Sequence, residues 1–245
     1  MRSTDSNFVR GDPAGRRPPA VLCDFDDTTA GENVAQLLLT HFSDDGTRLR
    51  LQEQSRQETI TFREYQEQAF AATRASREAM SSLVKSKATL RPYFKELWQY
   101  CLAMDIPLAI VTIGLDFYVE ALMDKEGLDR VPTYAVKTSF TPQGVILEYP
   151  HPWDGSGAAT RETCQQWGNC KCSVLGQYRS KGHSIVYVGD GCSDFCPASM
   201  ADQVFARGPL AQMCREREVP FTEFHDFQVV IQSLQPALVQ SRDEE

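Results

Sequence analysis

Short apolar runs, separated by amphipathic stretches, dominate the chain from residue 20 to residue 206. Helical periodicity appears between most of these runs, for instance at Tyr93, Leu97 and Cys101. The runs themselves are continuously hydrophobic, as is typical of strands buried on both faces of a parallel sheet. Strand alternating with helix predicts an α/β fold with a doubly wound, Rossmann-like sheet. The predicted strands are 20–25, 107–112, 133–136, 184–189 and 203–206.

The connection between the first two predicted strands is unusually long. It holds roughly eighty residues, far more than an ordinary crossover needs. Apolar residues recur there at helical spacing, as at Val34, Leu37 and Leu38, and Thr61 is suited to the start of a helix. We predict a small helical cap of residues 32–86, inserted after the first strand and lying over its end as a lid. The alternative is a helical bundle packed on the sheet flank without that role.

The remaining segments complete the predicted domain organisation. Residues 20–31 and 87–240 would form the α/β core. Residues 1–19, with Arg16-Arg17-Pro18-Pro19, and residues 241–245 are too polar to bury apolar surface, so they are expected to be disordered tails.

Composition limits the partners of the chain. The net charge is −8 and lysine and arginine form no large cluster, which argues against nucleic acid or an anionic membrane surface and favours a small molecule. The sequence lacks both a membrane-length apolar stretch and a secretory signal, so a cytoplasmic location is expected. Its eight cysteines are expected to be reduced thiols, because disulfide frameworks belong mainly to smaller secreted domains. No pattern predicts an oligomeric state.

Two carboxylates project from the end of the first predicted strand. Asp24 and Asp26 are two residues apart, so along an extended chain they point to the same face. They could therefore share a cation, or one could attack as a nucleophile while the other transfers a proton.

Two other strands also end in polar loops. In Val111-Thr112-Ile113-Gly114, the Thr112 hydroxyl and the following backbone N–H groups could bind an anion. Gly189-Asp190-Gly191 lets the backbone approach closely, and Asp194 follows one turn later. Alone, each loop would be read as a helix cap or a turn.

Together these loops point to a cation. The carboxylates of Asp24, Asp26, Asp190 and Asp194 would repel one another unless a cation or a proton neutralised them. Mg²⁺ prefers such hard oxygen ligands, together with water and a substrate phosphate.

The motifs occur in the order found in the haloacid dehalogenase superfamily of phosphohydrolases, which the chain resembles from Val21 to about Ala206. The helical insertion resembles the subclass that contains phosphoserine phosphatase. More closely, three short motifs resemble the methylthiopentenyl phosphate phosphatases of methionine salvage and the phosphoethanolamine/phosphocholine phosphatases. These motifs are Glu32-Asn33, Asp116-Phe117-Tyr118 and Cys170-Lys171-Cys172. The chain departs from the common pattern at Asp27, where many members have Gly, and at Thr112-Ile113, where close relatives have Ser-Gly.

The resemblance implies a role for each matching residue. Asp24 would attack phosphorus and form an aspartyl phosphate, while Asp26 would protonate the leaving oxygen and then deprotonate water. Mg²⁺ would be held by the Asp24 carboxylate, the Asp26 backbone carbonyl and Asp190, with Asp194 as a direct or an outer ligand. The implied phosphoryl-binding residues are Thr112, Ile113, Gly114 and Lys171.

The choice of lysine rests on its place in the chain. Lys171 precedes a helical run, whereas Lys181 lies in a hydrophilic turn at the opposite end of the 184–189 strand. We therefore predict Lys171 as the cation beside Asp24; the alternative is a solvated residue at a helix start.

Three further features keep two interpretations each. Glu32 and Asn33 could contact substrate from the base of the cap, or could simply stabilise a helix N-terminus. Cys164, Cys170 and Cys172 could bind a metal or be redox active, although their spacing is not a recognised zinc pattern; the alternative is that they are small residues packed beside the phosphate site. Residues 149–153 could form a flap over the substrate; a surface loop anchored by one buried Trp is preferred.

The sequence thus predicts a Mg²⁺-dependent phosphomonoester hydrolase acting on a small phosphorylated metabolite. A methylthiopentenyl-type phosphate is the first candidate substrate, followed by phosphoserine and by phosphoethanolamine or phosphocholine. A phosphotransferase to a small alcohol is a second class. A phosphate-sensing scaffold without activity is a third, and the presence of every catalytic group argues against it.

Overall fold

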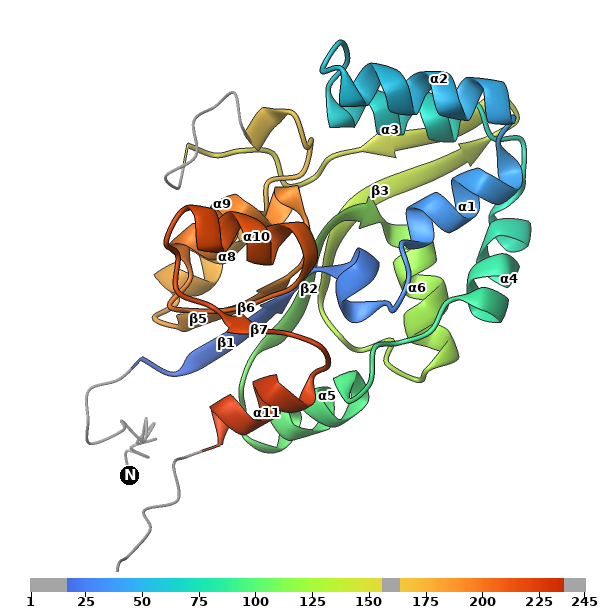
Figure 1. Ribbon diagram of the computed structural model, residues 1–245. Helices are drawn as coiled ribbons and strands as arrows, with labels where there is room; N and C mark the ends of the chain where they lie inside the picture. Colours follow the sequence, from blue (N-terminus) through green and yellow to red (C-terminus); the bar gives the residue numbers. More distant parts are fainter. Residues whose placement is uncertain (1–16, 156–163, 236–245) are drawn as a thin grey trace, which may run out of the picture.

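A twisted seven-stranded sheet forms the centre of the part of the chain that the computed structural model describes, residues 17–155 and 164–235 (Figure 1). Its order is β4-β3-β2-β1-β5-β6-β7, and only the β3–β4 pair is antiparallel. The predicted tails lie outside the described residues, except for residues 17–19. The strands are β1 Pro19–Cys23, β2 Leu108–Leu115, β3 Thr133–Thr141, β4 Gly144–Glu148, β5 Ser184–Gly189, β6 Gln203–Ala206 and β7 Thr222–Glu223.

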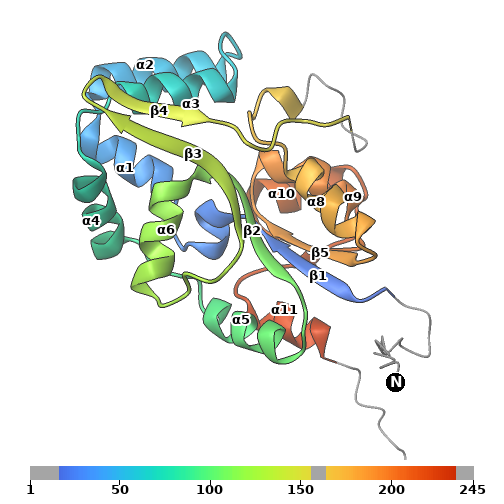
Figure 2. The same cartoon turned by 180° about the vertical axis from the view of Figure 1, so that it is seen from behind.

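Alternate residues of the central strands point into two separate hydrophobic cores, one on each face of the sheet. In β1, Val21 and Cys23 face one core and Ala20 and Leu22 face the other. Both faces are covered by helices (Figures 1 and 2), which explains the continuous apolar runs. One face carries α5 Phe94–Ala103, α6 Asp116–Lys125 and α11 Gln228–Leu234, and the other carries α8 Lys171–Ser180, α9 Phe195–Met200 and α10 Gly208–Glu216. The predicted doubly wound α/β fold is confirmed.

Strand boundaries differ from the predictions at the sites of greatest interest. β5 and β6 have the predicted bounds, but β1 ends at Cys23 because the chain enters a tight turn, Phe25–Thr29, in which Asp27 has φ +56°. β2 continues to Leu115 with a break in its register to β3. β4 and β7 were not predicted, since β4 is a half-exposed hairpin strand and β7 has two exposed residues.

Besides α5, four α-helices occupy the long connection between β1 and β2 (Figure 1). Thr61 caps the third of them in a capping box with Glu64. The β3–β4 hairpin supports the same helix, because Gly144 lies so close to the Ala71 carbonyl that a side chain there would clash (Figure 2). The helices are α1 Val34–Phe42, α2 Asp45–Arg56, α3 Phe62–Ala71 and α4 Arg77–Lys87.

None of the helices within 17–155 and 164–235 combines the length and the apolar character needed to cross a membrane.

Candidate active site

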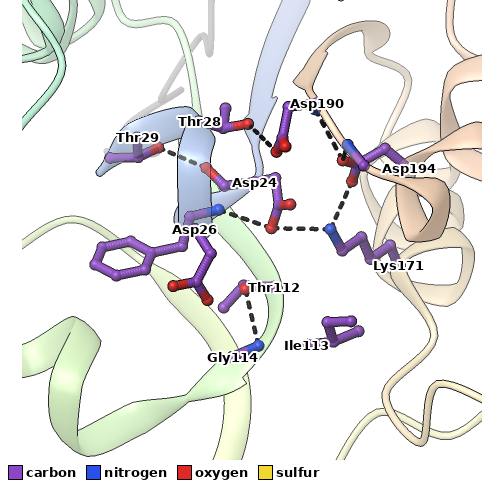
Figure 3. A network of polar contacts seen from close by, with 12 residues as sticks. Asp24, Asp26, Thr28, Thr29, Thr112, Ile113, Gly114, Lys171, Asp190 and Asp194 are labelled. Carbon is purple, nitrogen blue, oxygen red and sulfur yellow. Dashed lines mark hydrogen bonds and ion pairs between the residues drawn. The ribbon is translucent and has the colours of Figure 1, made fainter. Parts of the chain in front are cut away.

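The topology brings three polar strand ends to one edge of the sheet. β1 lies between β2 and β5 and runs parallel to both, so Asp24, Thr112 and Asp190 emerge side by side (Figure 3). The backbone N–H of Asp24 still donates to the Val188 carbonyl of β5, at 2.9 Å. The nearby polar groups are therefore anchored to regular structure and not to a free loop.

A buried lysine joins two of the carboxylates. Lys171 begins α8, and its Nζ lies 2.8 Å from Asp24 Oδ1 and 2.5 Å from Asp194 Oδ1 (Figure 3). Its side chain is only 2% exposed. Burial would lower the pKa of Lys171, but the two carboxylates hold it above its ordinary value. Lys181, the alternative, lies at the other end of α8 beside the Tyr178 ring.

Both carboxylate oxygens of Asp194 already have bonding partners. Its Oδ1 also accepts from the Tyr187 hydroxyl at 2.6 Å, and its Oδ2 accepts from the backbone N–H groups of Asp190 and Gly191 at 3.0 and 2.9 Å. A Cβ on Gly189 would lie 2.7 Å from Asp194 Oδ2, so only glycine fits at that position. Burial would raise the pKa of Asp194, but Lys171 and these donors lower it. Asp194 therefore holds Lys171 in place as a carboxylate.

Asp26 lies on the other side of Asp24, against the first cap helix. Its Oδ1 accepts from the backbone N–H of Val34 at 2.6 Å, and its Oδ2 accepts from the Tyr118 hydroxyl at 2.7 Å. Burial raises the pKa of Asp26 to about 6, although both hydrogen bonds oppose the shift. A carboxyl group with that pKa can give up and regain a proton near neutral pH.

The last part of β2, after the break in its register, contains a local hydrogen bond. The N–H of Gly114 donates to Thr112 Oγ1 at 2.9 Å, so the hydroxyl hydrogen is free to point toward an anion (Figure 3). A Cβ on Gly114 would collide with the Tyr118 hydroxyl and lie 2.9 Å from Asp26 Oδ2. Gly114 is thus required for the contact between Tyr118 and Asp26.

Two arginines hold the turn after Asp26. Arg91 Nε donates to the Thr28 carbonyl at 2.7 Å, and Arg207 donates to the Asp27 carbonyl at 3.1 Å. Thr28 Oγ1 in turn donates to Asp190 Oδ1 at 2.8 Å. Burial and the neighbouring Asp194 raise the pKa of Asp190 to about 6. Neither arginine belongs to a sequence motif, so neither was predicted as part of the site.

The strand ends form the floor of a cavity of about 390 Å³. All charged residues among its described lining are on this floor: Asp24, Asp26, Asp27 and Asp190. Opposite them the lining is apolar or neutral, with Leu39, Phe62, Tyr65, Phe70, Trp167, Gln36 and Gln66. Four carboxylates would repel an anion, so the floor suits an anionic group only together with a cation. The opposite wall suits an uncharged, partly apolar remainder.

Gln66 connects the cap to the floor. Its Nε2 donates to the Ile113 carbonyl at 2.9 Å, while its buried Oε1 has no hydrogen-bond partner among the described residues. The Ile113 carbonyl needs a donor, which fixes the orientation of the amide. An unpartnered buried acceptor on a cavity wall is suited to a ligand hydroxyl.

The remaining predicted residues take different places. Asn33 lines the cavity and caps α1, but Glu32 is bonded to the backbone N–H and hydroxyl of Thr89, both at 2.9 Å, away from the cavity lining. Residues 149–153 do not contribute to the described lining either; Trp153 packs against the buried thiols. The sulfurs of Cys164, Cys170 and Cys172 lie together, as their grouping in the sequence suggested.

Replacing Lys171 with Met is expected to destabilise the fold by about 3–5 kcal/mol at neutral pH, because two buried carboxylates lose their cation. Chemical denaturation of both proteins measures the difference. Ionised Asp194, whose folded-state pKa is lowered, stabilises the wild type above its unfolded pKa and ceases to do so as pH falls. The difference should therefore shrink in acid. Exposed Lys181→Met is the control, expected to change stability by less than about 0.5 kcal/mol; equal effects would contradict the buried ion pair.

Comparison with known proteins places the chain among phosphatases. The sequence model of the family described as "Putative Phosphatase" matches residues 20–216. A 2-hydroxy-3-keto-5-methylthiopentenyl-1-phosphate phosphatase of Lysinibacillus sphaericus is 31% identical over 222 residues, covering 88% of this chain and 95% of the relative. The protein of the same name in Exiguobacterium sibiricum is 29% identical over 216 residues, with the same coverage.

Solved structures share the fold at lower identity. A HAD family hydrolase of Salmonella enterica serovar Typhi has a TM-score of 0.70 at 15% identity, covering 91% of this chain and 73% of that one. A phosphoserine phosphatase, solved as a phospho-aspartyl intermediate analogue, has a TM-score of 0.64 at 15% identity, covering 90% and 100%. The predicted resemblance to haloacid dehalogenase phosphatases is confirmed. Because its model matches residues 20–216, this chain belongs to the family described as "Putative Phosphatase".

Proposed function

We propose that the protein hydrolyses a small, otherwise uncharged phosphomonoester in two steps, with Asp24 as nucleophile and Asp26 as acid and then base. One observation carries the proposal. Both carboxylates lie on the floor of one cavity; Asp24 is paired with buried Lys171, and Asp26 has a pKa of about 6. Groups in adjacent but unlike environments are suited to different roles in one reaction.

In the first step Asp24 attacks phosphorus. Its Oδ1 accepts from the Phe25 N–H and from Lys171, so Oδ2 is the attacking atom. As the new O–P bond forms, the ester P–O bond breaks and Asp26 gives its proton to the leaving oxygen. The products are the free alcohol and a phosphoryl group on Asp24.

In the second step Asp26, now a carboxylate, takes a proton from water while the water oxygen attacks phosphorus. The bond to Asp24 breaks, and phosphate leaves. Lys171, beside Asp24, and the Thr112 hydroxyl would hold the phosphoryl oxygens throughout. Tyr118 orients the reactive Oδ2 of Asp26.

The residues present fit a magnesium ion. Asp24, Asp190 and Asp194 offer carboxylate oxygens within 4.8 Å of one another. Burial and the Asp194 carboxylate raise the pKa of Asp24 well above its ordinary value against the effect of Lys171, so a second cation would favour the ionised nucleophile. Since both Asp194 oxygens are occupied, Asp24, the Asp26 backbone carbonyl and Asp190 are the proposed ligands. When bound, Mg²⁺ would neutralise charge on the phosphoryl group.

The cap supports the choice of substrate. We propose that residues 32–86 close over the bound molecule as a lid, since Gln66 bonds to the Ile113 carbonyl and the Phe62 ring lies 5.3 Å from that of Trp167. The described cap wall is apolar and uncharged, which suits a methylthiopentenyl-type phosphate, as the relatives' names suggest. Phosphoserine would leave its ammonium and carboxylate without charged partners there.

Phosphocholine is the second candidate substrate. The rings of Phe62, Tyr65 and Trp167 line the same wall, and aromatic faces attract quaternary ammonium groups.

A substrate panel tests this proposal. Phosphate release would be measured with the methylthiopentenyl-type phosphate, phosphoserine, phosphoethanolamine and phosphocholine, each with Mg²⁺ and with excess chelator. Release that needs Mg²⁺ and is fastest with the first substrate is expected. Preference for phosphoserine would contradict the uncharged wall, and phosphorylation of added glycerol or homoserine in place of hydrolysis would indicate a phosphotransferase.

Replacing Gln66 with Leu should lower kcat/KM by roughly tenfold to a hundredfold, because a substrate hydroxyl and the Ile113 carbonyl each lose a partner. Steady-state kinetics would show this, while inhibition by inorganic phosphate, which lacks the leaving group, should change little. Gln57→Leu, on the exposed surface of the cap, is the control. Unchanged kinetics in Gln66→Leu would remove this residue from substrate recognition.

A further inference from the structure

Four cysteines from three segments meet beside the phosphate site. The sulfurs of Cys164, Cys170 and Cys172 lie within 4.8 Å of one another, and all three residues are less than 5% exposed. Cys196 on α9 packs against them and interacts with the Cys164 and Cys172 thiols. All four also line one small cavity. We call this set the cysteine cluster: Cys164, Cys170, Cys172 and Cys196.

The separation of the sulfurs suits a metal ion at their centre. Zinc binds thiolates at about 2.3 Å in a tetrahedron, which puts neighbouring sulfurs about 3.8 Å apart. Three sulfurs mutually within 4.8 Å need only a small inward movement to reach that separation. Cys196 on α9 would supply the fourth corner. Its sulfur does not lie within 4.8 Å of all three others, so it would have to move further than they do.

The surroundings of Cys170 favour a thiolate. Cys170 is the N-cap residue of α8. Hydrogen bonds from the thiols of Cys164 and Cys172, together with the backbone N–H groups of Ser173 and Cys172, lower its pKa despite burial. The pKa values of Cys164 and Cys172 are raised beside it, so a further thiolate there needs a cation.

The ligand atoms distinguish the cysteine cluster from the carboxylate site. Sulfur ligands favour zinc and bind magnesium poorly, whereas the carboxylates of Asp24 and Asp190 are hard oxygen ligands that suit magnesium. None of the eight cysteines, all within the described residues, forms a disulfide in the structure. A disulfide would join only two members of the cysteine cluster, and one metal ion satisfies all four.

We propose that the cysteine cluster binds one zinc ion as a structural site, separate from the magnesium chemistry. Binding replaces the remaining thiol protons, which pass to solvent, with sulfur–zinc bonds. Cys170 and Cys172 flank Lys171, and Cys196 follows Asp194 by two residues. The zinc therefore ties the start of α8 to α9 and keeps the Lys171–Asp194 ion pair assembled.

Metal analysis of the purified wild-type protein tests the site without any substitution. After exhaustive dialysis in Mg²⁺ buffer, elemental analysis should find one zinc per chain. Titration with p-hydroxymercuribenzoate should release it to a colorimetric zinc indicator as the thiols are modified. Reduced, zinc-depleted protein should take up Co²⁺ with the absorption bands of a tetrahedral thiolate complex. A reduced wild type that holds no zinc and develops no such bands overturns the proposal.

Cysteine variants assign the ligands. Cys170→Ser and Cys196→Ser should each weaken zinc binding about tenfold or more in chelator competition, since even the loss of supporting contacts costs that much. Exposed Cys192→Ser, close to the cysteine cluster in sequence, should keep its zinc. Equal zinc affinity in all three variants, or a disulfide within the cysteine cluster found by mass spectrometry of the protein as purified, overturns the proposal. If a variant fails to fold, the zinc release and the Co²⁺ spectrum of the wild-type protein decide whether the zinc site exists.

Discussion

Asp24→Asn is expected to lower kcat by about 10⁴-fold or more, because an amide cannot form the phosphoryl intermediate. The substitution preserves the size of the side chain and the hydrogen bond from the Phe25 N–H. Substrate binding through Thr112 should therefore survive, and the loss should appear in kcat more than in KM. The effect is measured as phosphate release over long incubations with the Asp24→Asn variant, prepared without contaminating wild-type enzyme.

Asp27→Asn is the matched control for that result. It removes one carboxylate from the same turn, and asparagine tolerates the φ of +56° found there. The Asp27 carboxylate accepts a hydrogen bond from Asn33 and has no part in the proposed chemistry. Activity within severalfold of wild type is expected; a collapse similar to that of Asp24→Asn would mean that charge in the turn, and not nucleophilic attack, explains the loss.

Asp26→Asn should lower kcat about 10²- to 10⁴-fold, the usual contribution of a positioned acid–base group. The loss should depend on the leaving group. p-Nitrophenyl phosphate needs no proton for its departure, so its first step should be nearly normal while hydrolysis of the intermediate stays slow. Rapid-mixing experiments should then show a burst of p-nitrophenol followed by slow turnover.

Tyr118→Phe provides the comparison for Asp26. It removes the hydrogen bond to Asp26 Oδ2 but leaves the carboxyl group in place. The Tyr118 hydroxyl lowers the pKa of Asp26, so the pH–rate profile of Tyr118→Phe should shift to higher pH. Hydrolysis should continue without a burst. If Asp26→Asn shows the same loss for p-nitrophenyl phosphate as for alkyl phosphates, and no burst, the acid–base role is wrong.

The position of the strand-end residues could be predicted from sequence for a simple physical reason. The carboxyl ends of parallel strands lie at the same edge of a sheet. The motifs at the ends of the predicted strands 20–25, 107–112 and 184–189 were therefore expected to meet there. The structure accordingly brings Asp24, Thr112 and Asp190 together. The choice of Lys171 over Lys181 followed from the same reasoning, because the two lie at opposite ends of α8.

Residues positioned by tertiary packing could not be found in this way. Gln66 lies on an amphipathic cap helix, and nothing in the helical period distinguishes it from a core position. Cys196 is separated from the other three cysteines by most of α8, β5 and the Asp190 loop, so spacing gave no reason to group it with them. Strand β4 was missed because it is short and two of its five residues are exposed.

The central claim is that Asp24 carries the phosphoryl group, and trapping that group tests it most directly. Asp26→Asn protein would be mixed with p-nitrophenyl phosphate and Mg²⁺, quenched in acid and digested, and its peptides mapped by mass spectrometry. The account predicts the added mass of one phosphoryl group on the peptide that contains Asp24, stable in acid and lost on mild alkaline treatment or with hydroxylamine. Release of p-nitrophenol in a burst with no phosphorylated peptide, or with the group on another residue, would contradict it.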